Sequence, residues 1–167
     1  EQVPAMDVYV LPNNKNIVMA AEQAARLART SGVRRIHVVP TTTIPQGISA
    51  MMAYDESAEI KDNVEAMQEA ASRVQSGSVT FAARDSDYDG HQIKEGELLA
   101  LENGKVAFTG TDLGSVTAKV AKDLMQEDSQ FITLLYGADV SEEQAADVEE
   151  AVRSLLPEEV ELTVAYG

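Results

Sequence analysis

Apolar positions in the first part of the chain change from the pattern of a strand to that of a helix and back again. Residues 7–11 predict a short strand that stops at Pro12. Apolar side chains then recur at helical spacing over about 17–30, and a second strand is predicted over 35–39. Because strand, helix and strand follow one another within a few dozen residues, we expect a βαβ unit with two parallel strands.

The remaining segments continue this alternation of helices and strands. We predict helices over about 47–54, 60–74, 113–124 and 141–155, strands over 79–83, 131–135 and 160–165, and β-hairpins over 92–109 that turn at Glu95-Gly96 and Asn103-Gly104. Asp112 is the expected N-cap of its helix, and Ser141 with Gln144 has the spacing of a capping box.

This order of elements predicts an α/β fold built on a mainly parallel sheet that is layered with helices. The segment of about 79–109 is the exception, since its hairpins predict an antiparallel edge or a small sub-lobe. We expect residues 1–167 to form a single α/β domain.

Charge and composition narrow the classes of function. The chain has 28 acidic and 13 basic residues, a net charge of −15, which repels nucleic-acid backbones and anionic lipid surfaces. It contains no cysteine, which excludes disulfides and thiolate metal sites. No apolar run has the length of a membrane span, so we expect a cytoplasmic protein without membrane insertion.

The stretch ARDSDYDGHQIKEGE, residues 83–97, begins like a calcium-binding EF-hand loop because aspartates at alternate positions precede a glycine. An EF-hand needs a bidentate Glu at the twelfth position, but counting from Asp85 that position is Gly96. The preceding residues are also rich in β-forming side chains instead of helical ones. We therefore favour a tight turn at Asp89-Gly90 over a calcium site, and expect no bound metal.

Polar side chains gather in the two loops that follow the strands of the predicted βαβ unit, at 12–16 and 40–47. Because both loops leave the same edge of a parallel sheet, we expect them to lie side by side. The candidate partner- or ligand-binding residues there are Asn13, Asn14, Lys15, Asn16, Thr41, Thr42, Thr43, Gln46 and Gly47. Their amides, hydroxyls and ammonium group suit an anion or a polar backbone, although the glycine spacing of a phosphate-binding loop is missing. Alternatively, Asn14 or Asn16 caps the helix and the threonines satisfy loop backbone groups.

Other residues with possible chemistry have simpler explanations. Arg84 follows a predicted strand and either pairs with Asp85 or faces the two polar loops; both alternatives stay open. His37 lies in the middle of a strand, as a buried or edge histidine does. Met51 and Met52 lie in an apolar helix and are predicted to belong to the core. Pattern alone therefore predicts no catalytic residues.

Three blocks, VLPNNKNIVMAAEQAA, VVPTTTIPQGISAMMAYD and LLYGADVSEEQA, resemble the C-terminal domain of the YloV-like family, the A subunit of bacterial fatty acid kinase, long labelled as dihydroxyacetone-kinase-like. The likeness covers essentially the whole chain in the same order. It implies a C-terminal fragment of a longer multidomain protein, whose relatives continue past Gly167. A helical domain that binds ATP and magnesium and a central dimerisation domain would precede it, so no cofactor is expected in this chain.

The same resemblance implies a partner. In that family the kinase phosphorylates a fatty acid carried by a DegV-type B subunit, and the acyl phosphate product feeds phospholipid synthesis. The C-terminal domain is assigned to docking the B subunit, in addition to contacts with the other domains of its own polypeptide. We expect Pro12–Asn16 and Thr41–Gly47 to form or brace the docking face, and expect the chain not to be catalytic alone. The alternatives are a domain that binds a carboxylate or phosphate for a dihydroxyacetone-kinase-like active site, and a structural domain that completes the dimer of the kinase chain.

Overall fold

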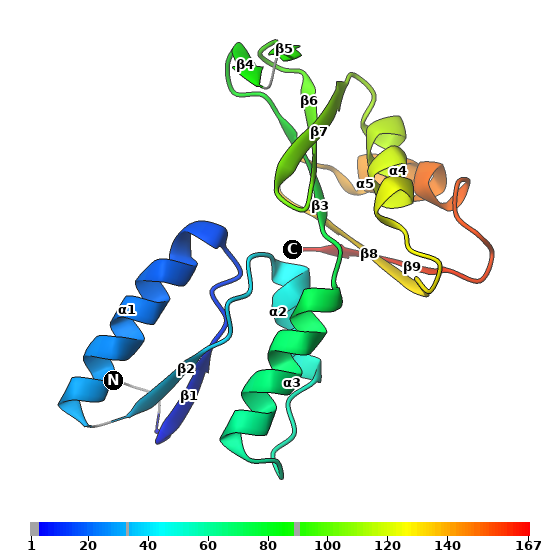
Figure 1. Cartoon of the computed structure of the whole chain (residues 1–167). Coiled ribbons are helices and arrows are strands. Elements are labelled where there is room, and N and C mark those ends of the chain that lie inside the picture. The colour runs from blue at the N-terminus through cyan, green and yellow to red at the C-terminus, as the bar shows by residue number, and fades with distance from the viewer. Residues whose placement is uncertain (1–3, 33, 89–90) are drawn as a thin grey trace. The chain divides into compact units, whose positions relative to one another are not determined.

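The computed structural model describes residues 4–32, 34–88 and 91–167, which divide into two compact units, Glu1–Val74 and Gln75–Gly167 (Figure 1). The helices are α1 (Lys15–Ser31), α2 (Ile44–Met52), α3 (Ile60–Arg73), α4 (Leu113–Leu124) and α5 (Glu142–Arg153). The strands are β1 (Asp7–Val10), β2 (Arg35–Val38), β3 (Gly77–Phe81), β4 (Ser86–Tyr88), β5 (His91–Ile93), β6 (Leu98–Glu102), β7 (Lys105–Gly110), β8 (Phe131–Tyr136) and β9 (Glu161–Tyr166). The predicted α/β class is confirmed. The expectation that both units make one domain stays a prediction, and each unit is described by itself.

The first unit is built on the predicted βαβ motif, which is confirmed. Strands β1 and β2 pair in parallel, and α1 crosses between them and packs against β2 (Figure 1). Gly32 adopts a left-handed conformation, with φ of 67°, that ends α1. Tyr9 and Leu11 pack against a core of Val39, Ala50, Met67 and Ala71, which joins the first sheet to α2 and α3.

Helix α2 begins three residues earlier than predicted, at Ile44 instead of about Gly47. The hydroxyl of Thr43 accepts a hydrogen bond from the backbone N–H of Gln46 at 3.4 Å and so caps the helix. Pro45 in the first turn has no N–H to satisfy and its ring already holds a helical φ. The proline therefore starts the helix, where the pattern of apolar residues alone placed a loop.

In the second unit, β3, β6 and β7 form an antiparallel sheet that α4 covers through Val116 and Val120. Asn103 and Gly104 have φ values of 49° and 78°, as the tight turn of the predicted hairpin requires. The turn at Gly96 also forms, but it joins β5 to β6, which belong to different sheets. It therefore does not close a hairpin as predicted.

Strands β8 and β9 form a second βαβ motif with α5 between them. The two strands pair in parallel and pack on α4 and α5 through Ala118, Val152 and Leu162. The predicted capping box is present, since Gln144 N–H donates to the hydroxyl of Ser141 and the Gln144 side chain accepts from Ser141 N–H.

The described strands do not form the single, mainly parallel sheet that the sequence predicts. They form four small sheets, of which β1–β2 and β8–β9 are parallel and β3–β6–β7 and β4–β5 are antiparallel. A strand–helix–strand pattern shows that two strands can pair in parallel, but it does not show that one such pair joins another. The antiparallel arrangement predicted for about 79–109 is confirmed.

The residues bracketing the aspartates of 85–89 are strands, as predicted, instead of the helices of an EF-hand. Ser86 pairs with Ile93 and Asp87 with Gln92 across β4 and β5. The predicted turn at Asp89-Gly90 lies outside the described residues.

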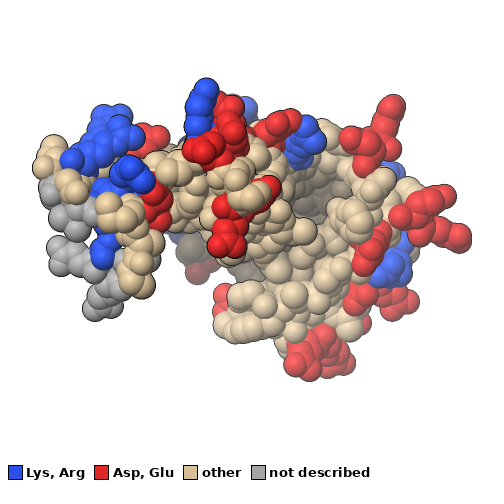
Figure 2. Space-filling model, turned by 90° about the horizontal axis from the view of Figure 1, so that it is seen from below, with Lys and Arg blue, Asp and Glu red and all other residues tan. Residues whose placement is uncertain are grey.

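The surface carries the acidic excess of the composition, and Figure 2 shows a face on which acidic side chains cover more area than basic ones. The excess is uneven. Residues 1–74 contain 9 acidic and 7 basic residues, whereas residues 75–167 contain 19 and 6. Within the described part of the chain, every helix is too short or too polar to cross a membrane.

Candidate functional site

The two polar loops of the first unit are joined by hydrogen bonds, as their place in a parallel sheet predicts. The hydroxyl of Thr41 donates to Oδ1 of Asn13 at 2.8 Å and accepts from the Asn13 backbone N–H at 3.2 Å. Thr41 is completely buried. We call residues 12–16 and 40–47 together the loop edge.

Gly47 completes this contact because it leaves room for the Asn13 side chain. A Cβ at position 47 would lie 2.1 Å from Oδ1 of Asn13, far inside van der Waals contact. Asn13 itself has a φ of 53°, a left-handed conformation that asparagine tolerates better than most residues. Asn13, Thr41 and Gly47 therefore hold the two loops in one arrangement.

Other polar groups of the loop edge are used for capping. Oδ1 of Asn14 accepts from the N–H of Asn16 at 2.8 Å and caps α1. Oε1 of Gln46 accepts from both the backbone N–H and the hydroxyl of Thr42, at 2.8 and 2.9 Å. Lys15 and Asn16 are exposed in the first turn of α1. The loop edge is thus a rigid polar surface whose own hydrogen bonds fix its shape.

The prediction that Met51 and Met52 belong to the core is wrong, since they are 65% and 83% exposed. Gly47 and Ala50 are the residues of α2 that are buried. Because these small residues allow α2 to approach its neighbours closely, the larger side chains lie on the outer side. Ile44 and Ile48, 53% and 48% exposed, complete what we call the apolar stripe: Ile44, Ile48, Met51 and Met52.

Arg84 belongs to the second unit, where it is exposed in the loop after β3. Among the ion pairs of the described residues, none joins it to Asp85, whose Oδ1 instead accepts from the backbone N–H of Glu95 at 2.7 Å. The local ion pair is therefore not formed. A role for Arg84 beside the loop edge stays a prediction.

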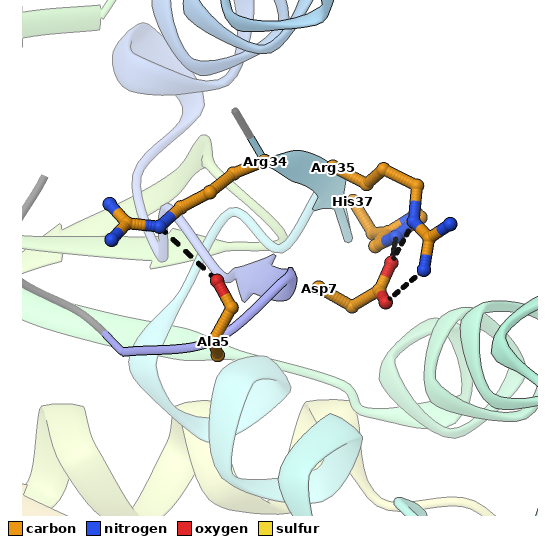
Figure 3. Close-up of polar contacts among 5 residues, drawn as sticks. All are labelled: Ala5, Asp7, Arg34, Arg35 and His37. Carbon is orange, nitrogen blue, oxygen red and sulfur yellow. Dashed lines mark hydrogen bonds and ion pairs between the residues drawn. The ribbon is translucent and has the colours of Figure 1, made fainter. Parts of the chain in front are cut away.

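A polar cluster that the sequence analysis missed spans β1 and β2 (Figure 3). The guanidinium of Arg35 donates to both carboxylate oxygens of Asp7, at 2.7 and 2.5 Å, and Nε2 of His37 lies 2.9 Å from Oδ1 of the same carboxylate. Arg34 points the other way and donates from Nε to the carbonyl oxygen of Ala5 at 3.2 Å. Hydrogen bonds from Arg35, and then from His37, hold the pKa of Asp7 well below its usual range.

The alternation of side chains along each strand shows in the sequence which of these residues share a face. Asp7 and Tyr9 share one face of β1, and Arg35 and His37 share a face of β2. Only the register, with Asp7 opposite Arg35 and Tyr9 opposite His37, brings these side chains together.

His37 also lines an open hollow of about 600 Å³ beside α3. The other lining residues are Glu59, Ile60, Lys61, Val64, Glu65 and Gln68. Lys61 is 3.6 Å from Glu65, which leaves Glu59 as the other charged side chain of this wall. Among the described residues no group of three or more histidines or carboxylates is placed to hold a metal ion.

The Asp7 cluster predicts a pH dependence of stability. Because its pKa is lowered on folding, the carboxylate contributes stability above the pKa of the unfolded chain, about 4, and this contribution is lost as the pH falls toward the lower folded value. We expect Asp7→Asn to reduce the free energy of unfolding at pH 7, and expect the gap from wild type to narrow steadily below about pH 4. Urea unfolding followed by circular dichroism at several pH values measures both.

Glu56→Gln removes an exposed carboxylate outside this cluster and is the matched control. Parallel pH profiles for wild type and Asp7→Asn would show that the ion pair does not stabilise the fold.

The chain is similar in sequence to known proteins. Over residues 1–167 the chain matches the FakA-like family model, which describes the C-terminal part of proteins like the A subunit of fatty acid kinase. The YloV protein of Bacillus subtilis is 37% identical over 167 residues, which is 100% of this chain and 29% of YloV. An uncharacterized protein of Staphylococcus haemolyticus is 40% identical over 158 residues, 95% of this chain and 28% of that protein. One from Staphylococcus aureus is 36% identical over 160 residues, 89% of this chain and 28% of that protein. The chain thus spans less than a third of the length of these relatives.

Proposed function

This chain belongs to the FakA-like C-terminal family of fatty acid kinase, and on that premise we propose that its loop edge docks the fatty-acid-carrying, DegV-type B subunit of the kinase. The transfer of phosphate from ATP to the fatty acid would then take place on other domains of the full-length kinase chain. ATP and magnesium would bind there, and the acyl phosphate would enter phospholipid synthesis. This domain would supply the recognition step.

One observation carries the proposal: hydrogen bonds within the chain itself join the two loops of the loop edge. The Asn13–Thr41 hydrogen bonds and the space left by Gly47 fix both loops, while Lys15 and Asn16 stay exposed. A surface that is already ordered loses little conformational entropy on binding, so more of the contact energy appears as affinity.

The alternative use of the same edge is to bind a small anion. Lys15 lies in the first turn of the 17-residue helix α1, where the helix dipole also favours negative charge. A carboxylate or phosphate bound there would make this domain part of a composite active site. Lys15→Ala distinguishes the two functions, because it would abolish anion binding if Lys15 holds an anion but leave docking of the B subunit in place.

Titration calorimetry of the whole chain with the lipid-loaded B subunit tests the proposal. We expect binding by the wild type, and weaker binding by Asn14→Ala and Thr41→Ala because both variants loosen the loop edge. Circular dichroism must first show that each variant is folded. No heat of binding from a folded wild-type chain would refute docking by the isolated domain.

The same series of variants distinguishes docking from an anion site and from a purely structural domain. A chain that binds inorganic phosphate, and loses this with Lys15→Ala while still binding the B subunit, would support the anion site. A chain that dimerises alone and ignores the B subunit would support a purely structural domain.

A further inference from the structure

The apolar stripe of α2 lies in the longest part of the first unit without charge. From Ile36 to Tyr54 there is no Asp, Glu, Lys or Arg, although such residues make up 25% of the whole chain. Within this stretch the four side chains of the stripe are between 48% and 83% exposed. Ile44 belongs to both the loop edge and the stripe, so the stripe continues the surface of the loop edge along α2.

The fold prevents α2 from burying the stripe by turning about its axis. Gly47 has no room for a Cβ because of Asn13, and Ala50 is fully buried in the core with Met67. Turning the helix would bring isoleucine or methionine into these tight positions. The stripe is therefore built to face outward, and clustered exposed apolar side chains typically mark a binding surface.

We propose that the apolar stripe docks an uncharged, aliphatic face of the B subunit, in a contact that forms and breaks during turnover; this inference rests on the proposed function. An uncharged surface fits an uncharged partner face, because burying an unpaired charge against it would be costly. Methionine suits this contact, since its flexible side chain adapts to the surface that it meets. The first unit, with 9 acidic and 7 basic residues, carries only a small part of the chain's net charge of −15.

Charge and area argue against two other occupants. Helices that lie on membranes carry lysine and arginine beside their apolar face, and residues 36–54 contain neither, in a chain with a net charge of −15. Four such side chains expose on the order of a few hundred Å², whereas a stable dimer interface buries about 800 Å² on each partner. The stripe is too small for a stable homodimer and of the right size for a contact that is repeatedly broken.

The experiment compares Met51→Gln/Met52→Gln with wild type in calorimetric titrations of the whole chain with the lipid-loaded B subunit. Glutamine keeps the length and helix propensity of methionine but removes its apolar character. We expect the double variant to bind about tenfold more weakly or worse. Met19→Gln, which changes a 71% exposed methionine on α1, is the matched control and should bind like wild type. The loss of affinity caused by the double variant should change little with salt, because the stripe itself contains no charged side chain.

Each outcome decides the inference. If wild type and the double variant bind equally well, the stripe is not part of the interface, although the docking function stands. If neither the wild type nor any variant binds the B subunit, the proposed function fails and the inference fails with it. A dimer seen in sedimentation that the double variant abolishes would make a second copy the occupant and overturn the inference. If the double variant is not fully folded, Met52→Gln alone, at the most exposed position, should still weaken binding measurably.

Discussion

Replacing Thr41 by Val is expected to lower the free energy of unfolding of the first unit by roughly 2–3 kcal/mol. Valine has almost the shape of threonine, so packing in this fully buried position is kept. What is lost is the hydroxyl that serves Asn13 twice, as acceptor for its N–H and donor to its Oδ1. Both groups of Asn13 then lack a partner in a partly buried loop, and an unmade hydrogen bond there costs more than an exposed one. Urea unfolding followed by far-UV circular dichroism measures the loss.

Two variants separate the hydroxyl from other effects. Thr41→Ser keeps the hydroxyl and should retain most of the stability. Thr42→Val removes an exposed hydroxyl that bonds Gln46 and should change stability by less than about 0.5 kcal/mol. A Thr41→Val protein as stable as wild type would mean that the bridge between the loops contributes nothing to the fold.

The position of the loop edge follows from the sequence because it depends on topology alone. A helix between two short strands favours parallel pairing, and parallel pairing places the loop at 12–16 beside the loop at 40–47. The caps at Asp112 and Ser141 are equally local, since each needs only its own turn of helix. These local features were therefore predicted correctly, whereas the start of α2 at Ile44, equally local, was not.

Features that depend on which surfaces meet were not predicted. The sequence of α2 carries no charge, and both its small and its large apolar residues suit a core, so its pattern gives no sign that Gly47 and Ala50 face inward and Met52 outward. Two parallel pairs likewise do not reveal whether they share a sheet, and here β1–β2 and β8–β9 do not. The pattern also does not predict the register between β1 and β2. The contact of Asp7 with Arg35 and His37 therefore appeared only in the structure.

Replacing Gly47 by Ala is expected to destabilise the first unit by roughly 1–3 kcal/mol, although alanine is otherwise the better helix former by about 1 kcal/mol. The new methyl group would lie 2.1 Å from Oδ1 of Asn13. The Asn13 side chain must then leave its place, which breaks its hydrogen bond with Thr41, or α2 must shift away from the loop. Thermal and urea unfolding of Gly47→Ala measure the cost.

The second variant, Asn13→Gly, tests whether that clash is the cause. Glycine accepts the left-handed backbone of position 13 without strain and leaves no side chain for the methyl group to meet. In the double variant the two losses should not add, and the shortfall should be about 1 kcal/mol or more. Gly137→Ala, where a Cβ would meet nothing within 4 Å, is the matched control and should be nearly neutral. Strictly additive losses would place the cost of Gly47→Ala elsewhere than at Asn13.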